Sequence, residues 1–299
     1  MSSIGKRLSA IVLLLLVLAV LPTKAMGQAV ITWGADLEPE DRVKVMELMD
    51  LANREKPARE LEVTNGEEHA LLGASVPASY LGTRAISSAY VRPLPVGQGL
   101  QVTTHNITWV SRRMFAQALI TAGVRDAEII AVAPMAVSGT AALTGVFKAF
   151  EAAADTELAE PGKRIAGEEL YVTREVGKRV GEKQASRLVE RVKEEVIRKN
   201  ITDRTTIVEL IRQVEMEMDL KLSPGDVEKL ADLMTKLSGL GLTIEDLQIQ
   251  LEKMSDQMDG LMGAETGLKS TVTSWLQRLL DLIARLIDQF LAFVAGARA

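Results

Sequence analysis

The stretch 127-AEIIAVAPMAVSGTAALTG-145 joins an apolar run to a helical pattern, and it largely decides the class of fold. Residues 127–133 are apolar on both faces, which is typical of a central strand with a layer on each side. We expect this strand to end at Pro134 and a helix capped by Ser138 to follow it. The helix carries an apolar stripe at positions i, i+3, i+4 and i+7, formed by Leu143, Val146, Phe147 and Phe150. A buried strand followed closely by a helix favours an α/β fold.

Two further strands are expected before this stretch. Residues 84–94 are rich in small and β-branched side chains, and residues 100–110 form a second such run after a turn with two prolines and two glycines. The alternation within 100–110 is broken, which predicts a bulge or burial on both faces. A helix that is capped by Ser111 and ended by Gly123 follows. Residues 28–160 are therefore predicted to form an α/β unit, in which a mixed sheet has helices on its flanks.

The beginning of this unit gives a weaker pattern. The chain from Ile31 is expected to be an extended lead-in, followed by a helix from Pro39, because proline is favoured at the first position of a helix. Residues 61–65 form a short piece of unassigned type, and residues 66–73 predict a brief helix.

The segment 161–262 is predicted to be a helical region, because leucine and valine recur at helical spacing and no strand pattern is convincing. Residues 222–234 and 242–254 each place a hydroxyl before an acidic residue in the arrangement of a capping box. The charges are divided: residues 163–204 hold twelve Lys or Arg against eight Asp or Glu, and residues 205–262 hold five against twelve. Packing between oppositely charged helices is the simpler interpretation, and a basic face that binds an anionic wall polymer is the alternative.

The first 27 residues have the three parts of a secretory signal peptide. Lys6 and Arg7 form a basic start, residues 8–21 form an apolar run that is short for a membrane span, and residues 22–29 form a small-residue exit. We expect cleavage after Gly27 or after Ala29, and a secreted, extracytoplasmic location in the cell envelope. An uncleaved membrane anchor is the alternative interpretation.

The composition restricts the function classes. The chain of 299 residues has no cysteine, which in an exported protein means no disulfide bond and no thiol chemistry. A net charge of −5 and only 4% aromatic residues argue against nucleic-acid binding. With His69 and His105 as the only histidines, a multi-histidine metal site cannot be built, and we expect no metal and no cofactor.

Residues 263–299 are predicted to be a linker and an amphipathic C-terminal helix. Within 271–296, Arg278, Asp281, Arg285 and Asp288 form a ladder of alternating charge on one face. The rest of the circumference is apolar and is too wide to face water. We expect this face to mediate self-association into a homo-oligomer or docking, and a membrane surface is the alternative partner. The expected contact residues are Trp275, Leu279, Leu282, Ile283, Leu286, Phe290 and Phe293.

The turn after the buried strand is the candidate site. Helix N-termini present free N–H groups, so Ser138, Gly139 and Thr140 are candidates for binding a ligand or an anion, together with Asn106. No phosphate-binding glycine pattern and no nucleophile-elbow pattern is present. Ser138 with His105 as general base forms the weak catalytic alternative, and the orienting acid would be Asp36, Asp41 or Asp126. A capped helix and a packed histidine are the ordinary structural interpretations of the same residues.

Several blocks in the same order resemble the YpuA-like family of exported bacterial proteins, a domain of unknown function (1002). They include 32-TWGADL-37, 62-EVTNGEEHALLG-73, 82-GTRAISSAYV-91, 102-VTTHNITWV-110 and 133-APMAVSGTAALTGVFKAFE-151. The resemblance implies an extracytoplasmic protein with a signal peptide. It supplies no established activity and no catalytic residues.

Together these observations favour a non-enzymatic cell-envelope or secreted protein that binds a partner through its α/β unit. An extracytoplasmic hydrolase that uses Ser138 and His105 is the enzyme alternative, and association with a membrane surface through residues 271–296 is the other.

Overall fold

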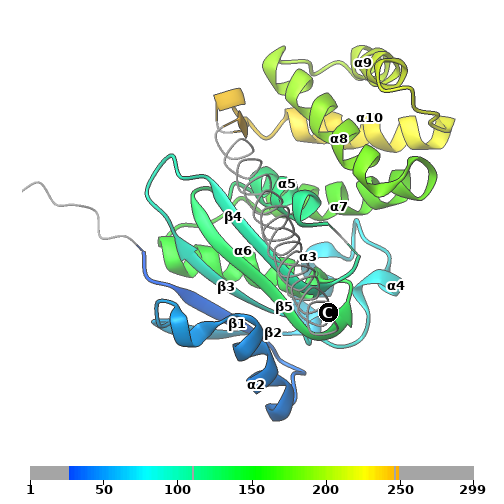
Figure 1. Cartoon of the computed structure of the whole chain (residues 1–299). Helices are drawn as coiled ribbons and strands as arrows, with labels where there is room; N and C mark the ends of the chain where they lie inside the picture. The colour runs from blue at the N-terminus through cyan, green and yellow to red at the C-terminus, as the bar shows by residue number, and fades with distance from the viewer. Residues whose placement is uncertain (1–26, 110, 246, 249–299) are drawn as a thin grey trace, which may run out of the picture.

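The computed structural model describes residues 27–109, 111–245 and 247–248, and its first part is built on a five-stranded sheet (Figure 1). The strands are β1 Val30–Gly34, β2 Arg59–Val63, β3 Ser88–Pro93, β4 Leu100–Ile107 and β5 Ala127–Val137, in the order β2-β1-β3-β5-β4. β1 pairs in parallel with β2 and β4 pairs in parallel with β5, whereas β3 runs antiparallel to both of its neighbours. Four strands therefore point the same way, and their carboxyl ends lie along one edge of the sheet.

The two faces of the sheet are covered unequally. One face packs against α3 (Asn65–Leu72), α4 (Ala78–Leu81), α5 (Arg112–Ala122) and α6 (Thr140–Ala154), which together bury the largest apolar core. The other face packs against α2 (Pro39–Leu48) and the short helix η1 (Leu51–Asn53), over a smaller core that includes Ile31, Trp33 and Tyr90. This arrangement confirms the predicted mixed sheet with flanking helices.

The helical region that follows has its own core. It comprises α7 (Glu160–Val180), α8 (Glu182–Arg198), α9 (Arg204–Glu217) and α10 (Pro224–Ser238). Figure 1 shows α8, α9 and α10 gathered at one end of the molecule, with α7 between them and the sheet unit. The capping box predicted at residues 222–234 is confirmed, because Ser223 and Asp226 bond reciprocally to each other's backbone N–H.

The predicted end of the third strand is wrong, since β5 continues through Pro134 to Val137. β3 pairs with β5 only as far as Val132, and the pairing with β4 jumps from His105–Val132 to Ile107–Val137. Pro134 lies inside this jump, where the ladder needs no N–H from it, so the extended backbone continues. The jump is the irregularity that the broken alternation of residues 100–110 predicts.

The predicted cap of the following helix is also wrong. α6 begins at Thr140, its N-cap is Gly139, and no side chain caps it. Because β5 extends to Val137, the turn has only two residues, and Gly139 makes it with φ of 93°. A Cβ at this glycine would lie 2.4 Å from Cγ2 of Ile107, so both the backbone angle and the space require glycine. The Ser138 hydroxyl is therefore free for another role.

The two ends of the chain fall outside this description. The predicted signal peptide lies in residues 1–26 except for Gly27, and the predicted C-terminal helix with all of its contact residues lies in 249–299. Within the described ranges, none of the helices has both the length and the apolar content that crossing a membrane requires.

Candidate functional site

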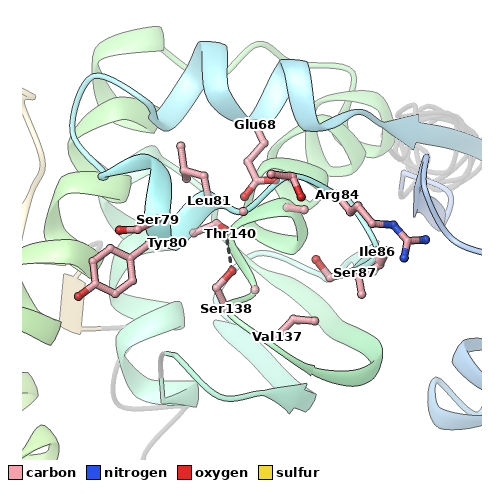
Figure 2. Close-up of a pocket in the computed structure, with 14 residues that line it drawn as sticks. Glu68, Ser79, Tyr80, Leu81, Arg84, Ile86, Ser87, Val137, Ser138 and Thr140 are labelled. Carbon is pink, nitrogen blue, oxygen red and sulfur yellow. Dashed lines mark hydrogen bonds between the residues drawn. The ribbon is translucent and has the colours of Figure 1, made fainter.

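A cavity of about 330 Å³ lies at the carboxyl edge of the four parallel strands, and we call it the edge cavity. It is lined by Glu68 of α3, by residues 79–84, by Ile86 and Ser87 just before β3, and by residues 137–141 at the junction of β5 and α6 (Figure 2). Open α/β sheets characteristically bind ligands outside the carboxyl ends of their strands, where helix N-termini converge. The position of the edge cavity is therefore that of a ligand site.

Glu68 is the unusual residue of the edge cavity. Its side chain is completely buried, and its Oε1 has no hydrogen-bond partner among the described residues. Oε2 accepts a hydrogen bond from Nδ2 of Asn65 at 3.3 Å. Burial raises the pKa of the Glu68 carboxyl, and the hydrogen bonds from Thr140 and Asn65 offset this only in part. A buried acceptor without a donor costs free energy, so it is expected to serve a purpose.

The junction of β5 and α6 contributes two hydroxyls to the edge cavity. The Oγ of Ser138 and the Oγ1 of Thr140 are 2.9 Å apart and share a hydrogen bond. Figure 2 shows Glu68 descending from α3 toward Thr140, with Ser138 on the other side of Thr140. Glu68, Thr140 and Ser138 thus form a row of polar side chains along this cavity.

The segment 82–87 forms the wall opposite these polar side chains and is held in place by Asp36. Oδ2 of Asp36 accepts from the backbone N–H of Ala85 at 2.7 Å, and its carbonyl accepts from Nη2 of Arg84 at 2.7 Å. Nε2 of His69 lies 3.0 Å from the carbonyl oxygen of Gly82 and fastens the start of the same segment to α3. Asp36 and His69 fix this wall from outside the cavity lining, whereas Arg84 belongs to the lining.

The predicted site residues are placed as follows. Ser138, Gly139 and Thr140 all line the edge cavity. Asn106 does not line it: this residue forms the bulge of β4 with φ of 59°, and its Nδ2 donates to the carbonyl oxygen of Ala133 at 2.8 Å. Asn106 thereby closes the gap that the irregular pairing leaves in the sheet.

His105 lies away from the edge cavity and on the other face of the sheet. Its register partner is Val132, which belongs to the core beneath α2, and paired residues of neighbouring strands face the same side. Burial lowers the pKa of His105, and the charges of Arg112 and Arg54 lower it further. Of its expected orienting acids, Asp126 accepts from the backbone N–H of Gly97 and Gly99 in the turn before β4. Ser138 and His105 thus do not share a cavity.

Glu68 was not identified from the sequence. Two adjacent acids in a short helix look like a solvated surface, and the capping box of Thr64 and Glu67 gives them a structural explanation. The available signal was the spacing of Leu71 and Leu72, which lie three and four residues after Glu68 and place it on the apolar face of the helix.

A larger groove of about 680 Å³ lies beside α2, on the other face of the sheet. It is mainly apolar, with Val43 and Met46 exposed at its edge. Arg42 at its rim is paired with Glu60 at 2.6 Å and stacks over Trp33, so this charge is already satisfied. Among the described residues that line this groove, none has a buried polar atom without a partner, which is the feature that distinguishes the edge cavity.

The fold and the edge cavity define an α/β protein with a pocket at the carboxyl edge of its sheet and a helical region attached. The chain belongs to the family of proteins of unknown function DUF1002, whose model matches residues 33–254. It is 36% identical over 237 residues to the uncharacterized protein YpuA of Bacillus subtilis (strain 168), which covers 78% of this chain and 80% of that protein. No solved structure matches the chain. The family expected from the sequence blocks is confirmed.

Proposed function

We propose that this chain is an exported binding protein that holds a small polar ligand in the edge cavity. The observation that carries the proposal is the unpartnered Oε1 of the fully buried Glu68, which lines that cavity. A protein gains nothing in stability from such an acceptor, whereas a ligand that brings a donor would satisfy it. Specific sites commonly combine a concave surface with a few convergent polar groups of this kind.

Export is supported by the three-part signal in residues 1–27. We further propose that the amphipathic segment 271–296 mediates self-association, with a membrane surface as the alternative partner. Deleting residues 271–299 and measuring the oligomeric mass and the binding to liposomes tests this. If neither changes, the segment has no role in association.

The hydrolase alternative is less well supported. It requires a general base near Ser138, and His105 packs on the other face of the sheet. The acid that lines the same cavity, Glu68, has a side-chain hydrogen bond with Asn65, and no hydrogen bond of the described residues joins it to Ser138. We therefore favour binding over catalysis.

Pools of small polar compounds, observed through the backbone amide signals of the ¹⁵N-labelled protein, test the proposed binding. We expect at least one pool to shift the signals of residues 68, 82–87 and 138–141 in a saturable manner. Ser138→Leu should abolish these shifts by filling the edge cavity. Ala136→Leu is the matched control, because Ala136 is exposed and lies two residues before Ser138 without lining the cavity. If no pool produces saturable shifts at these residues, the proposed function is refuted.

A further inference from the structure

The charged groups around the edge cavity differ in what they can offer a ligand. Arg84 is exposed, donates through Nη2 to the carbonyl of Asp36 at 2.7 Å, and lies 3.6 Å from a carboxyl oxygen of Glu38. Figure 2 shows the guanidinium of Arg84 directed away from Glu68 and Ser138. Glu68, by contrast, is fully buried and has one oxygen without a partner. The charge available to a ligand is therefore negative.

The hydrogen bonds around Glu68 have a direction. Nδ2 of Asn65 can only donate, so Oε2 of Glu68 acts as an acceptor. The Oγ1 of Thr140 and the Oγ of Ser138 share a hydrogen bond at 2.9 Å, which either hydroxyl can donate. Oε1 of Glu68 therefore has open lone pairs, and the hydroxyl oxygen of Ser138 can accept a further hydrogen bond whichever hydroxyl of the pair donates. Both oxygens can accept a hydrogen bond from a donor group of a ligand.

We propose that the edge cavity recognises its ligand through a primary ammonium group seated on Oε1 of Glu68. This inference rests on the proposed binding function and names the chemical class of the ligand. An ammonium group carries three donors and no acceptor, so it matches the open lone pairs of Glu68 and Ser138. Its charge also compensates a carboxylate that burial would otherwise disfavour.

Two other ligand classes fit less well. An anion could approach the uncapped N-terminus of α6, but it would meet the Glu68 carboxylate in the same cavity. A divalent metal ion favours several carboxylate or histidine ligands, and the described residues contain no group of three such side chains that could hold one. A ligand with an ammonium group pairs with the open acceptors and is not repelled by the Glu68 carboxylate.

Three two-carbon probes that share a hydroxyl group test the proposal: ethanolamine carries an ammonium group, ethylene glycol is neutral and glycolate carries a carboxylate. Each is titrated into the ¹⁵N-labelled full-length protein while the amide signals of residues 68, 138 and 140 are followed. We expect saturable shifts with ethanolamine alone. In Glu68→Gln its affinity should fall at least about tenfold, because a charge-assisted hydrogen bond is replaced by a neutral one. Glu62→Gln, which removes an exposed acid outside the cavity, should leave the affinity unchanged.

Ser138→Ala provides a second variant that keeps the Glu68 charge, and we expect it to weaken ethanolamine binding severalfold. Equal or stronger binding of glycolate or ethylene glycol would overturn the ammonium assignment and leave the proposed binding function intact. The same conclusion follows if ethanolamine fails while a compound from the polar pools binds in the edge cavity. If neither the probes nor the pools bind, both the assignment and the proposed function fail.

Discussion

At the scale of single residues, two adjacent acids show how position decides chemistry. Partial burial opposes ionisation of Glu67, but hydrogen bonds from Lys148 and from Thr64 outweigh it and lower the pKa of Glu67. Burial dominates at Glu68 and raises its pKa, because the hydrogen bonds and the charge of His69 offset the loss of solvation only in part. One residue caps a helix at the surface, and its neighbour faces the edge cavity from inside the core.

The substitution Glu68→Gln is expected to stabilise the folded protein near pH 7. A carboxyl whose pKa is raised by folding contributes stability below the unfolded pKa and loses it as the pH rises through the folded pKa. The variant should therefore gain on the order of 1 kcal/mol in the free energy of unfolding relative to the native protein as the pH rises from 4 to 7. Urea unfolding at several pH values measures this, with Glu62→Gln as control. A difference that does not change with pH would show that Glu68 does not titrate as described.

Gly139→Ala should destabilise the protein by about 2 to 4 kcal/mol, since a positive φ and an overlap with Ile107 both oppose a side chain there. Gly97→Ala separates the two causes: Gly97 has φ of 85°, but a Cβ there would have no atom within 4 Å. In this control the free energy of unfolding should fall only by the cost of the backbone conformation, about 1 kcal/mol. Equal losses in thermal or urea unfolding would mean that the contact with Ile107 carries no cost.

At the scale of elements, the sequence predicts the strands and helices with clear patterns, including the short helix α3, and misses β2 and α4. β3, β4, α5 and α6 follow from periodicity and turn residues, whereas β2 is a five-residue strand with mostly exposed side chains and has no apolar run to reveal it. The continuation of β5 past Pro134 depends on how it pairs with β3 and β4, which no local pattern contains. Glu68 was missed for the same reason: its burial depends on α6 packing over α3.

The contacts just before β1 distinguish between the two expected cleavage positions of the proposed signal peptide. Ala29 is completely buried, its carbonyl accepts from the N–H of Ala58 at 2.9 Å, and its N–H lies 3.4 Å from Oε1 of Glu55. Cleavage after Gly27 preserves these contacts, and cleavage after Ala29 removes them. We expect the mature chain to begin at Gln28, and the intact mass of the secreted protein measures this. A chain that begins at Val30 would contradict the expectation.

At the scale of the whole molecule, helix α7 belongs to two cores at once. Ala166 and Leu170 pack into the core of the sheet unit, whereas Val172 and Val176 pack into the core of the helical region. A buried ion pair strengthens the junction: Nζ of Lys193 in α8 lies 2.6 Å from Oε1 of Glu169 in α7. The same Nζ donates to Oγ1 of Thr121 in α5 at 2.7 Å, so three helices share one ammonium group.

We expect the two parts to unfold in a single transition, and removing half of the buried pair to weaken both. Glu169→Gln should lower the free energy of unfolding by about 3 kcal/mol or more, because it leaves the Lys193 charge buried without its partner. In a Trp275→Phe background, tryptophan fluorescence follows the sheet unit through Trp33 and Trp109, and far-ultraviolet circular dichroism follows the helices. Both signals should shift together, and Glu169→Leu combined with Lys193→Met should restore much of the loss. Separate midpoints for the two signals would show that the parts unfold independently.

The shared helix also bears on how this chain could have evolved. If a recombination event separated the sheet unit from the helical region, the fragment that kept α7 would expose an apolar stripe to water. The fragment without α7 would lose the layer that closes its core. Neither fragment would be a good starting point for a new gene fusion. We therefore expect the sheet unit and the helical region to occur together in related proteins, with sequence gained or lost only outside these two parts.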